Sequence, residues 1–513
     1  MLPTWYGYLA QRPPQKIFMG FRFMAEDHNS YATFVNESAE EGKLFFENRY
    51  TTEPQKGRFL LLYMWLVGKI SRITGLGVVG SWELARLVSG FVFMLVTWCF
   101  ASLLFDDLRK RFLAYMFVAF SGGIGWLVYP LMMHWIRGMN DGVLKDPFNL
   151  QWNWSTFGSM TTPLWVAPAA LLLFCAYLIG GPRRKLRQSL GIILPPLIWF
   201  MHPYTGISAY ATFLLFPLVP VFRSAWHLER VSWQPVRERL ATVWPMLVSV
   251  VIVLVYIVWA RQDQVYALSA QRVFSWTPTY SLFLYPFAYG LVLVLALFGI
   301  KWGDSLPAHA RDILLAWLVA STILSLNPFL AGVKFQYLVH MPMAFLAANG
   351  LLELRCRSPW VKNFLKGGGA VLVGTLLFLN SALLVVKDYP STWRDATIFL
   401  SQPEIDAMKF LKDQSPGNVL SSASAGNRIA WLAAKKVYVG HWFLTIDYDR
   451  KVWEVHEFFD QQKSVDEKRE WLASRQIRYI YYGPTERSQG GVDPGLGLAP
   501  IYAQNGVTIY AVP

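Results

Sequence analysis

Long apolar runs recur through most of this sequence and limit its fold more than any other feature. A helix needs roughly 20 apolar residues to cross the hydrocarbon core of a bilayer, and about ten runs approach that length. Pro195-Pro196 and His202-Pro203 interrupt two of them, and such breaks are tolerated where the backbone lines a cavity rather than lipid. The sequence therefore predicts an α-helical polytopic membrane protein with about ten spans. The predicted spans are 82–105, 112–133, 161–180, 189–202, 203–222, 241–260, 281–300, 312–328, 336–353 and 369–387.

The composition supports a membrane protein and argues against nucleic-acid binding. Hydrophobic residues make up 54% of the chain and charged residues only 16%, whereas soluble proteins carry about 25% charged residues. The net charge of +14 would suit nucleic acid, but Lys and Arg fall in short clusters between the apolar runs, as membrane topology requires. Cys99, Cys175 and Cys356 have no ligand-like spacing, so we expect neither a disulfide framework nor a zinc site.

The basic residues between the runs predict the orientation of the chain. Cytoplasmic loops of membrane proteins carry an excess of Lys and Arg. Alternate loops are rich in basic residues, whereas the opposite loops hold few. This places the segment around residues 26–31 and the C-terminal tail outside. The basic loops contain Arg109–Arg111, Arg183–Arg187, Arg223–Arg239, Lys301, Arg311 and Arg355–Lys366, and the opposite loops contain Arg137, Lys145, Arg261, Arg272 and Lys334.

The N-terminal part raises a question of topology. With ten spans the N-terminus also faces outward, yet residues 1–25 hold no apolar run of signal-peptide length. We expect a span lost to a late start site; the alternative is a segment threaded without one. The run Phe59–Val67, between Arg58 and Lys69, is too short to span and is predicted to lie on the membrane surface. Residues 1–80 then form an outer loop, and residues 81–387 the transmembrane domain.

The composition changes after Lys387, where charges become frequent. Alternating and amphipathic patterns over residues 388–513 predict a small extracytoplasmic α/β domain. The strand-like runs are Val419–Ser422, Lys436–Val439, Ile477–Tyr482 and Val507–Val512, and the helical stretches are Glu404–Lys412, Lys451–Gln461 and Val465–Arg475.

The acidic pair Glu26-Asp27, followed by His28-Asn29-Ser30-Tyr31, is the first candidate for chemistry. Carboxylates beside a membrane are costly to desolvate, and two adjacent ones would raise one pKa and leave the other ionised. Asp27 is then a candidate general base, with Glu26 beside it. The alternative is that Asp27 or Asn29 caps a helix that starts near Tyr31. Three consecutive side chains rarely hold one ion, so we expect no metal on Glu26, Asp27 and His28. The sequence makes no cofactor certain, and dependence on a divalent metal stays open.

Lys334 is a cation in an outward loop where positive charge is scarce. It could take up the charge of a phosphate leaving group, or it could simply anchor its span by snorkelling.

Arg22 and Arg49 are further candidates for phosphate or sugar contacts, with ordinary headgroup contacts as the alternative. His202, before Pro203-Tyr204, could contact a sugar hydroxyl or satisfy the backbone at the proline break. Gly440-His441-Trp442 and Tyr482–Arg487 suit either sugar stacking or docking of the C-terminal domain.

Several of these motifs together resemble the GT-C superfamily of integral-membrane glycosyltransferases, and more narrowly a group of bacterial proteins within it. The resemblance extends over nearly the whole chain, although each motif is short. A span normally precedes the acidic loop in this superfamily, and it is absent here. The motifs are Glu26–Tyr31, Tyr50–Pro54, His202-Pro203-Tyr204, Lys334-Phe335 with Met341–Ala348, Gly440-His441-Trp442 and Tyr482–Arg487.

The resemblance implies a hexosyl- or pentosyltransferase of the bacterial inner membrane that uses a polyprenyl-phosphate-linked sugar. Transfer would be inverting, with Asp27 at the position of the acid and Lys334 at that of the cation. The acceptor would be a lipid or a glycan. Two rivals are a transporter or flippase of lipid-linked sugars, which needs no base, and a non-catalytic scaffold whose outer domain recruits partners. The residues expected at the donor and acceptor are Arg22, His28, Tyr31, Arg49, His202, Tyr204, Lys334 and Gln336.

Overall fold

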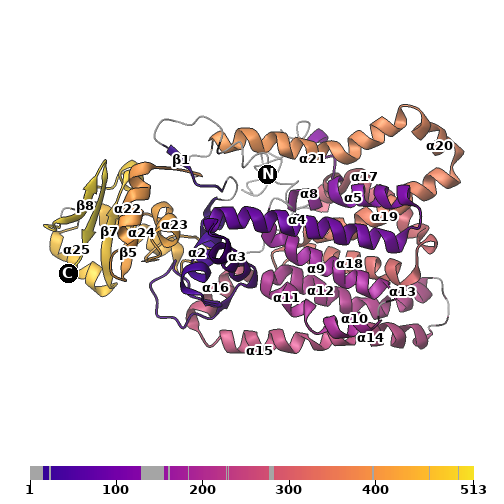
Figure 1. Ribbon diagram of the computed structural model, residues 1–513, viewed down its shortest axis with the longest axis horizontal. Coiled ribbons are helices and arrows are strands. Elements are labelled where there is room, and N and C mark those ends of the chain that lie inside the picture. Colours follow the sequence, from indigo (N-terminus) through magenta and orange to yellow (C-terminus); the bar gives the residue numbers. More distant parts are fainter. Residues whose placement is uncertain are drawn as a thin grey trace. The chain divides into compact units, whose positions relative to one another are not determined.

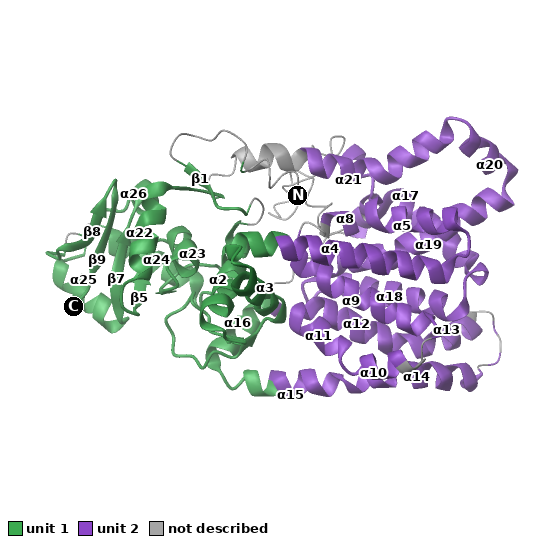
Figure 2. Cartoon of the chain, viewed as in Figure 1, with its two compact units in different colours: residues 1–83, 258–273, 388–513 green, residues 84–257, 274–387 purple. Residues whose placement is uncertain are grey.

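The computed structural model describes residues 8, 16–21, 25–128, 155–159, 162–182, 184–226, 228, 230, 232–275, 282–394, 398–460, 463–494 and 496–513. The chain divides into two compact units (Figure 2). Unit 1 combines residues 1–83, 258–273 and 388–513, and unit 2 combines residues 84–257 and 274–387.

Unit 2 is built from helices, most of them apolar. Within the described residues, six helical segments are long and apolar enough to cross a membrane, so the chain is a multi-pass membrane protein. These segments are Gly77–Leu104, Pro163–Gly180, Pro203–Ala225, Trp233–Ala260, Gly332–Arg357 and Gly369–Val386. The helices are α4 (Gly77–Leu104), α5 (Leu108–Phe120), α8 (Thr156–Ser159), α9 (Pro163–Gly180), α10 (Arg184–Gly191), α11 (Leu194–Met201), α12 (Pro203–Leu215), η1 (Phe216–Leu218), α13 (Val219–Trp226), α14 (Trp233–Val248), α15 (Val250–Ala260), η2 (Leu282–Leu284), α17 (Tyr285–Lys301), η3 (Gly303–Ser305), α18 (Ala308–Ser325), η4 (Gly332–Phe335), α19 (Gln336–Arg357), α20 (Pro359–Lys366) and α21 (Gly369–Arg394). Helices α4, α15 and α21 each have one end among the residues of unit 1.

The predicted polytopic helical fold is confirmed, while the number of spans stays a prediction. The proline break is where the sequence places it, because α11 ends at Met201 and α12 starts at Pro203, with His202 in an extended conformation between them. The predicted spans 189–202 and 281–300 correspond to shorter apolar helices. The predicted span 112–133 extends beyond α5 into residues that lie partly outside the described part of the chain.

Helices α17 and α19 pack with their backbones almost in contact. A Cβ atom on Gly299 would lie 1.8 Å from the carbonyl oxygen of Leu346, and one on Gly350 would lie 1.9 Å from that of Leu295. Small residues allow such an approach between helices in a membrane, where packing rather than the hydrophobic effect drives association. These two glycines therefore fix the distance between α17 and α19.

Unit 1 contains a five-stranded sheet in the order β6-β5-β7-β9-β8 (Figure 1). Strands β5, β6 and β7 are parallel, and β9 is antiparallel to both β7 and β8. Helices cover both faces, since the side chains of residues 479–482 in β7 pack alternately into two buried clusters. The elements are β5 (Asn418–Leu420), β6 (Lys436–Val437), β7 (Ile477–Tyr482), β8 (Pro500–Gln504), β9 (Val507–Ala511), α22 (Gln402–Lys412), α23 (Ala423–Leu432), α24 (Tyr448–Phe459), α25 (Val465–Ser474) and α26 (Pro484–Ser488).

The N-terminal stretch belongs to the same unit. Helix α2 (Ala25–Glu41) packs against α3 (Leu62–Thr74) and α23. The Asn36 side chain donates to the carbonyl oxygen of Trp431 (3.3 Å). Two short antiparallel pairs complete the unit, together with α16 (Gln264–Ser275), of which residues up to 273 belong to it. The pairs join β1 (Lys16–Phe18) to β4 (Phe399–Ser401) and β2 (Phe45–Phe46) to β3 (Phe59–Leu60).

The sequence patterns located most elements of the C-terminal part. All four predicted strand runs overlap a strand, and the three predicted helical stretches overlap α22, α24 and α25. Helices α23 and α26 and strand β8 were not predicted. Strand β8 is mostly exposed, so it lacks the alternation that marks a half-buried strand.

Candidate functional site

Asp27 lies in the first turn of α2, which begins at Ala25. The expectation that Asp27 or Asn29 caps a helix starting near Tyr31 is therefore wrong, because both residues are already helical. Carboxylates in the first turn are stabilised by the helix dipole and by the unpaired N–H groups there. Ser30 also donates its hydroxyl to the main-chain oxygen of Asp27 (2.7 Å). The start of α2 therefore offers positive partial charge to the carboxylates of its first turn.

Asp27 is paired with His441, 414 residues away in the sequence. The distance from His441 Nε2 to Asp27 Oδ1 is 2.9 Å. The other ring nitrogen, Nδ1, accepts the backbone N–H of Phe443 (3.3 Å). A neutral imidazole carries one proton, so this contact leaves the proton on Nε2, which donates to the carboxylate. The His441 side chain is 4% exposed and the Asp27 side chain 20% exposed, so the carboxylate remains accessible while its partner is fixed.

The segment around His441 is held rigidly. The Gly440 N–H donates to the hydroxyl of Thr445 (3.0 Å), and the Thr445 N–H returns to the His441 carbonyl (2.8 Å). A Cβ on Gly440 would come within 2.7 Å of the Tyr50 ring, so only glycine fits there. Tyr50 in turn packs edge-on against the His441 ring, with centroids 6.0 Å apart. The turn after β6 therefore holds the His441 imidazole next to the Asp27 carboxylate.

His28 and Tyr31, both predicted at the donor or acceptor, lie in an aromatic cluster of unit 1. Tyr31 stacks on Trp82 with centroids 5.7 Å apart. His28 stacks on Phe21 (5.2 Å) and packs edge-on against Trp82 (5.5 Å). Burial, and then the nearby Asp27 carboxylate, raises the pKa of Tyr31 well above its usual value. Tyr31 is thus a neutral phenol beside Asp27, whereas His28 is 7% exposed and packs within the cluster.

Arg49 is engaged with carboxylates of α2. Its guanidinium pairs with Glu41 and lies 3.6 Å from Glu37, and the residue is 7% exposed. Its backbone carbonyl accepts the N–H of Val437, the last residue of β6 (2.9 Å). Two carboxylates already balance this cation, and its contact with a phosphate or sugar stays a prediction. Arg22, the other predicted arginine, lies outside the described residues.

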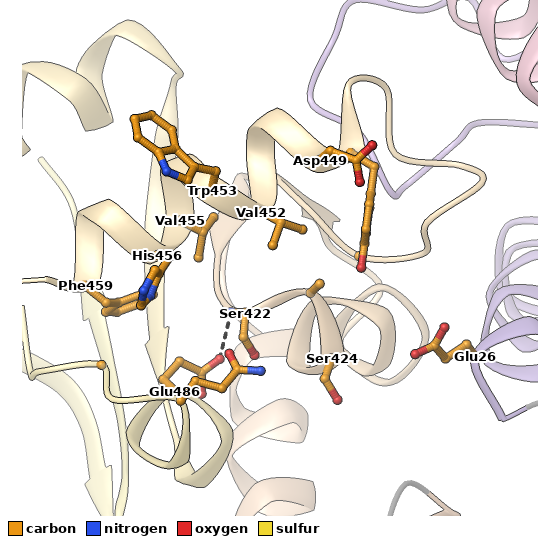
Figure 3. Close-up of a pocket in the computed structure, with 15 residues that line it drawn as sticks. Glu26, Ser422, Ser424, Asp449, Val452, Trp453, Val455, His456, Phe459 and Glu486 are labelled. Atoms are coloured by element: carbon orange, nitrogen blue, oxygen red, sulfur yellow. Dashed lines mark hydrogen bonds between the residues drawn. The ribbon is translucent and has the colours of Figure 1, made fainter. Parts of the chain in front are cut away.

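A pocket of about 690 Å³ opens where the parallel strands end. Ser422 follows β5, Gly440 follows β6 and Glu486 follows β7, and all three line it. The buried carboxylate of Glu486 accepts the Ser422 N–H (2.8 Å), which joins the ends of β5 and β7 (Figure 3). Glu26 also lines the pocket. Each member of the Asp27–His441 pair thus directly follows a residue that lines the pocket.

The remaining predicted site residues form a second cluster within unit 2. Lys334, in η4, lies with its ammonium 5.5 Å from the centre of the Trp165 ring, and Trp165 stacks on Tyr337 (5.8 Å). The Thr205 hydroxyl is 2.7 Å from the Tyr337 hydroxyl and 2.8 Å from Nδ1 of His202. The structure therefore places Lys334, His202 and Tyr337 in one polar and aromatic network. Tyr204 packs edge-on against Phe335, and Gln336 is fully buried at the start of α19.

Metal coordination stays open. Within the described part of the chain, no three His, Cys, Asp or Glu side chains gather in a metal-binding group. Asp27 is paired with an imidazole rather than with another carboxylate.

Comparison with known proteins gives similarity at the level of structure. No family model matches the chain, and no curated protein sequence does. One similar solved structure is the archaeal oligosaccharyltransferase AglB from Archaeoglobus fulgidus in complex with an inhibitory peptide and a dolichol-phosphate; the TM-score is 0.53 at 11% identity, over 100% of this chain and 72% of that one. Another is the oligosaccharyltransferase of the same organism tethered with an acceptor peptide, with a TM-score of 0.50, 11% identity and coverage of 100% and 73%. Because these enzymes belong to the GT-C superfamily, the chain has the fold of the GT-C integral-membrane glycosyltransferases.

Proposed function

We propose that this protein is a membrane glycosyltransferase. It moves a hexose or pentose from a polyprenyl-phosphate donor to an acceptor hydroxyl at the outer face of a bacterial inner membrane, with inversion. The observation that carries the proposal is the Asp27 carboxylate, which is accessible, held by His441 at 2.9 Å, and next in sequence to Glu26 on the wall of a pocket. The similar AglB structure was determined with a dolichol-phosphate, which supports a lipid-phosphate donor in general.

Asp27 acts on the acceptor. As the acceptor oxygen forms its bond to the anomeric carbon, the O–H bond breaks and the proton moves to the Asp27 carboxylate. The bond from the anomeric carbon to the phosphate oxygen breaks, and its electron pair leaves with the polyprenyl phosphate. A positioned carboxylate of this kind contributes roughly 10²–10⁴ in rate.

His441 is a positioning residue for Asp27. We expect His441→Ala to lower kcat by roughly 10- to 100-fold with little change in KM for the donor, since a carboxylate displaced by about 1 Å loses its alignment. His441→Gln retains an N–H donor and is expected to recover much of that loss. The measurement is steady-state kinetics of the purified variants. Equal kcat for wild type and His441→Ala would remove His441 from this role.

Lys334 serves the donor in unit 2. We expect Lys334→Met to lower kcat by roughly 10²-fold, because a group that stabilises developing charge on a leaving phosphate is worth that much. Lys334→Arg keeps the charge and should keep a larger share of the rate. Lys301→Met, at the exposed end of α17, is the matched control and should leave transfer unchanged. If Lys334→Met only lowered the thermal stability, Lys334 would be an anchor of its helix.

The experiment that tests the function uses the full chain in detergent or nanodiscs. Synthetic polyprenyl-phosphate sugars are supplied with a panel of glycan acceptors, and the release of polyprenyl phosphate and the formation of glycoside are followed by mass spectrometry. Glycoside with inverted anomeric configuration supports the proposal. If the donor crossed liposome membranes but stayed unconverted with every acceptor, the protein would be a transporter of lipid-linked sugars.

A further inference from the structure

The pocket of unit 1 lies where an α/β sheet is expected to bind a ligand. The chain runs from β5 through α23 to β6 on one side, and then returns through α24 and α25 to β7 on the other side of β5. The order therefore reverses next to β5, and ligands bind outside the carboxyl ends of parallel strands at such a switch point. The volume of about 690 Å³ falls within the range of roughly 300–1,000 Å³ that is usual for small-molecule sites.

The charge of the pocket is opposite to that of the protein. The chain has 47 Lys and Arg against 33 Asp and Glu. The described residues that line the pocket include Glu26, Asp449 and Glu486, and no Lys or Arg. Figure 3 shows Glu26 and Asp449 on one side of the pocket and His456 and Phe459 on the other. A strongly basic protein thus presents an acidic surface at this pocket.

Two of the three carboxylates, Glu26 and Asp449, both influence Tyr448 in the pocket wall. Glu26 and Asp449 are both exposed. Burial, and after it the negative charges of these two carboxylates, raises the pKa of Tyr448, the first residue of α24. Arg272 contacts the Tyr448 ring at 5.7 Å but does not line the pocket. The third carboxylate, Glu486, is 2% exposed and is occupied by backbone N–H groups. Glu26 and Asp449 therefore set the charge that a ligand meets.

The other lining groups suit a sugar. Trp453 is 59% exposed and provides a large apolar face with a polar N–H edge. The hydroxyl groups of Ser424 and Tyr448 also belong to the wall. Apolar surface with a few polar groups is the usual make-up of a small-molecule site.

We propose that this pocket binds the acceptor and that the acceptor is an amine-bearing glycan. The role of the glycan as acceptor rests on the proposed transferase function, whereas its binding to the pocket does not. A protonated amine on the sugar is attracted by Glu26 and Asp449. A uronic acid at the same place is repelled by them, and rejection through like charge is an efficient source of specificity. The phosphate of the donor is kept out of the pocket for the same reason.

The test measures binding of three matched probes to the full-length protein without any donor. The probes are the tetramers of glucosamine, N-acetylglucosamine and galacturonic acid, at a pH where the amines are protonated and the uronates ionised. We expect the glucosamine tetramer to bind roughly tenfold more tightly than the N-acetylated one, which corresponds to about 1.4 kcal/mol, and the galacturonate to bind most weakly. The preference should shrink as salt is added, because exposed charges are screened.

Asp449→Asn is the informative variant, and Asp466→Asn is its control. Asp466 is a 97% exposed carboxylate on α25 that does not line the pocket. Asp449→Asn should reduce the preference for the amine several-fold, and Asp466→Asn should leave it unchanged. Galacturonate binding as tightly as glucosamine, no binding of any tetramer, or an unchanged preference in Asp449→Asn would overturn the proposal. The glucosamine tetramer binding as expected, with no sugar transferred, would leave the pocket intact and refute the transferase function.

Discussion

Asp27→Asn is expected to abolish glycosyl transfer while leaving the protein folded and inserted. The amide has the shape of the carboxylate, and its oxygen can still accept the Nε2 proton of His441, which lies 2.9 Å from Oδ1 in the wild type. It cannot take the acceptor proton, so the general-base contribution of roughly 10²–10⁴ is lost. The measurement is the initial rate of glycoside formation by purified protein, together with the thermal unfolding midpoint.

Two comparisons make that experiment decisive. Asp466→Asn removes a carboxylate from the surface of α25, where the side chain is 97% exposed, and should transfer at the wild-type rate. Glu26→Gln distinguishes the two neighbouring acids, because Glu26 lines the pocket and its loss is expected to raise KM for the acceptor more than it lowers kcat. Wild-type turnover in Asp27→Asn would rule out Asp27 as the base.

Gly350→Ala is expected to have the largest effect on folding. The new Cβ would lie 1.9 Å from the carbonyl oxygen of Leu295 and 2.8 Å from the backbone nitrogen of Gly299. Backbone atoms cannot rotate away as a flexible side chain can, so α17 and α19 must separate. Overpacking typically costs about 1–3 kcal/mol, and we expect at least the upper end here. The measurement is the yield of monodisperse protein and its unfolding midpoint in detergent.

A second glycine provides the control for Gly350→Ala. Gly374 lies in α21, and a Cβ there would meet nothing within 4 Å. Because alanine favours helix over glycine by about 1 kcal/mol, Gly374→Ala should be neutral or slightly stabilising. If both variants behaved alike, the close approach of α17 and α19 would not determine stability.

Periodicity in the sequence predicted individual helices and strands but not which of them pack together. The alternation in Ile477–Tyr482 identified β7, and the run of apolar residues with its proline break identified α11 and α12. Helix α23 was missed because its N-cap, Ser422, lies only two residues beyond the end of β5 and fell within the predicted strand run Val419–Ser422. The start of α2 was placed too late because Asp27 and Asn29 have the composition of a cap.

Only part of the candidate site could be predicted from the sequence. Asp27 and Lys334 were singled out by charge in unusual places. The link from His441 to Asp27 could not be found, since 414 residues separate them and no local pattern encodes such a pairing. His441 was noted only within an aromatic stretch that suited sugar stacking or docking. The pocket escaped as well, because its wall combines the ends of three strands with a residue of α2.

Unit 1 is assembled from three stretches that are far apart in the chain, residues 1–83, 258–273 and 388–513. The first and third stretches are joined by the antiparallel pairing of β1 with β4. The Asn48 side chain also donates to the carbonyl oxygen of Leu444 (2.7 Å). A ribosome must therefore translate past residue 441 before Asp27 can meet its imidazole. Closing so long a loop is slow compared with local folding. Nascent chains that end before residue 441 consequently lack the Asp27–His441 pair.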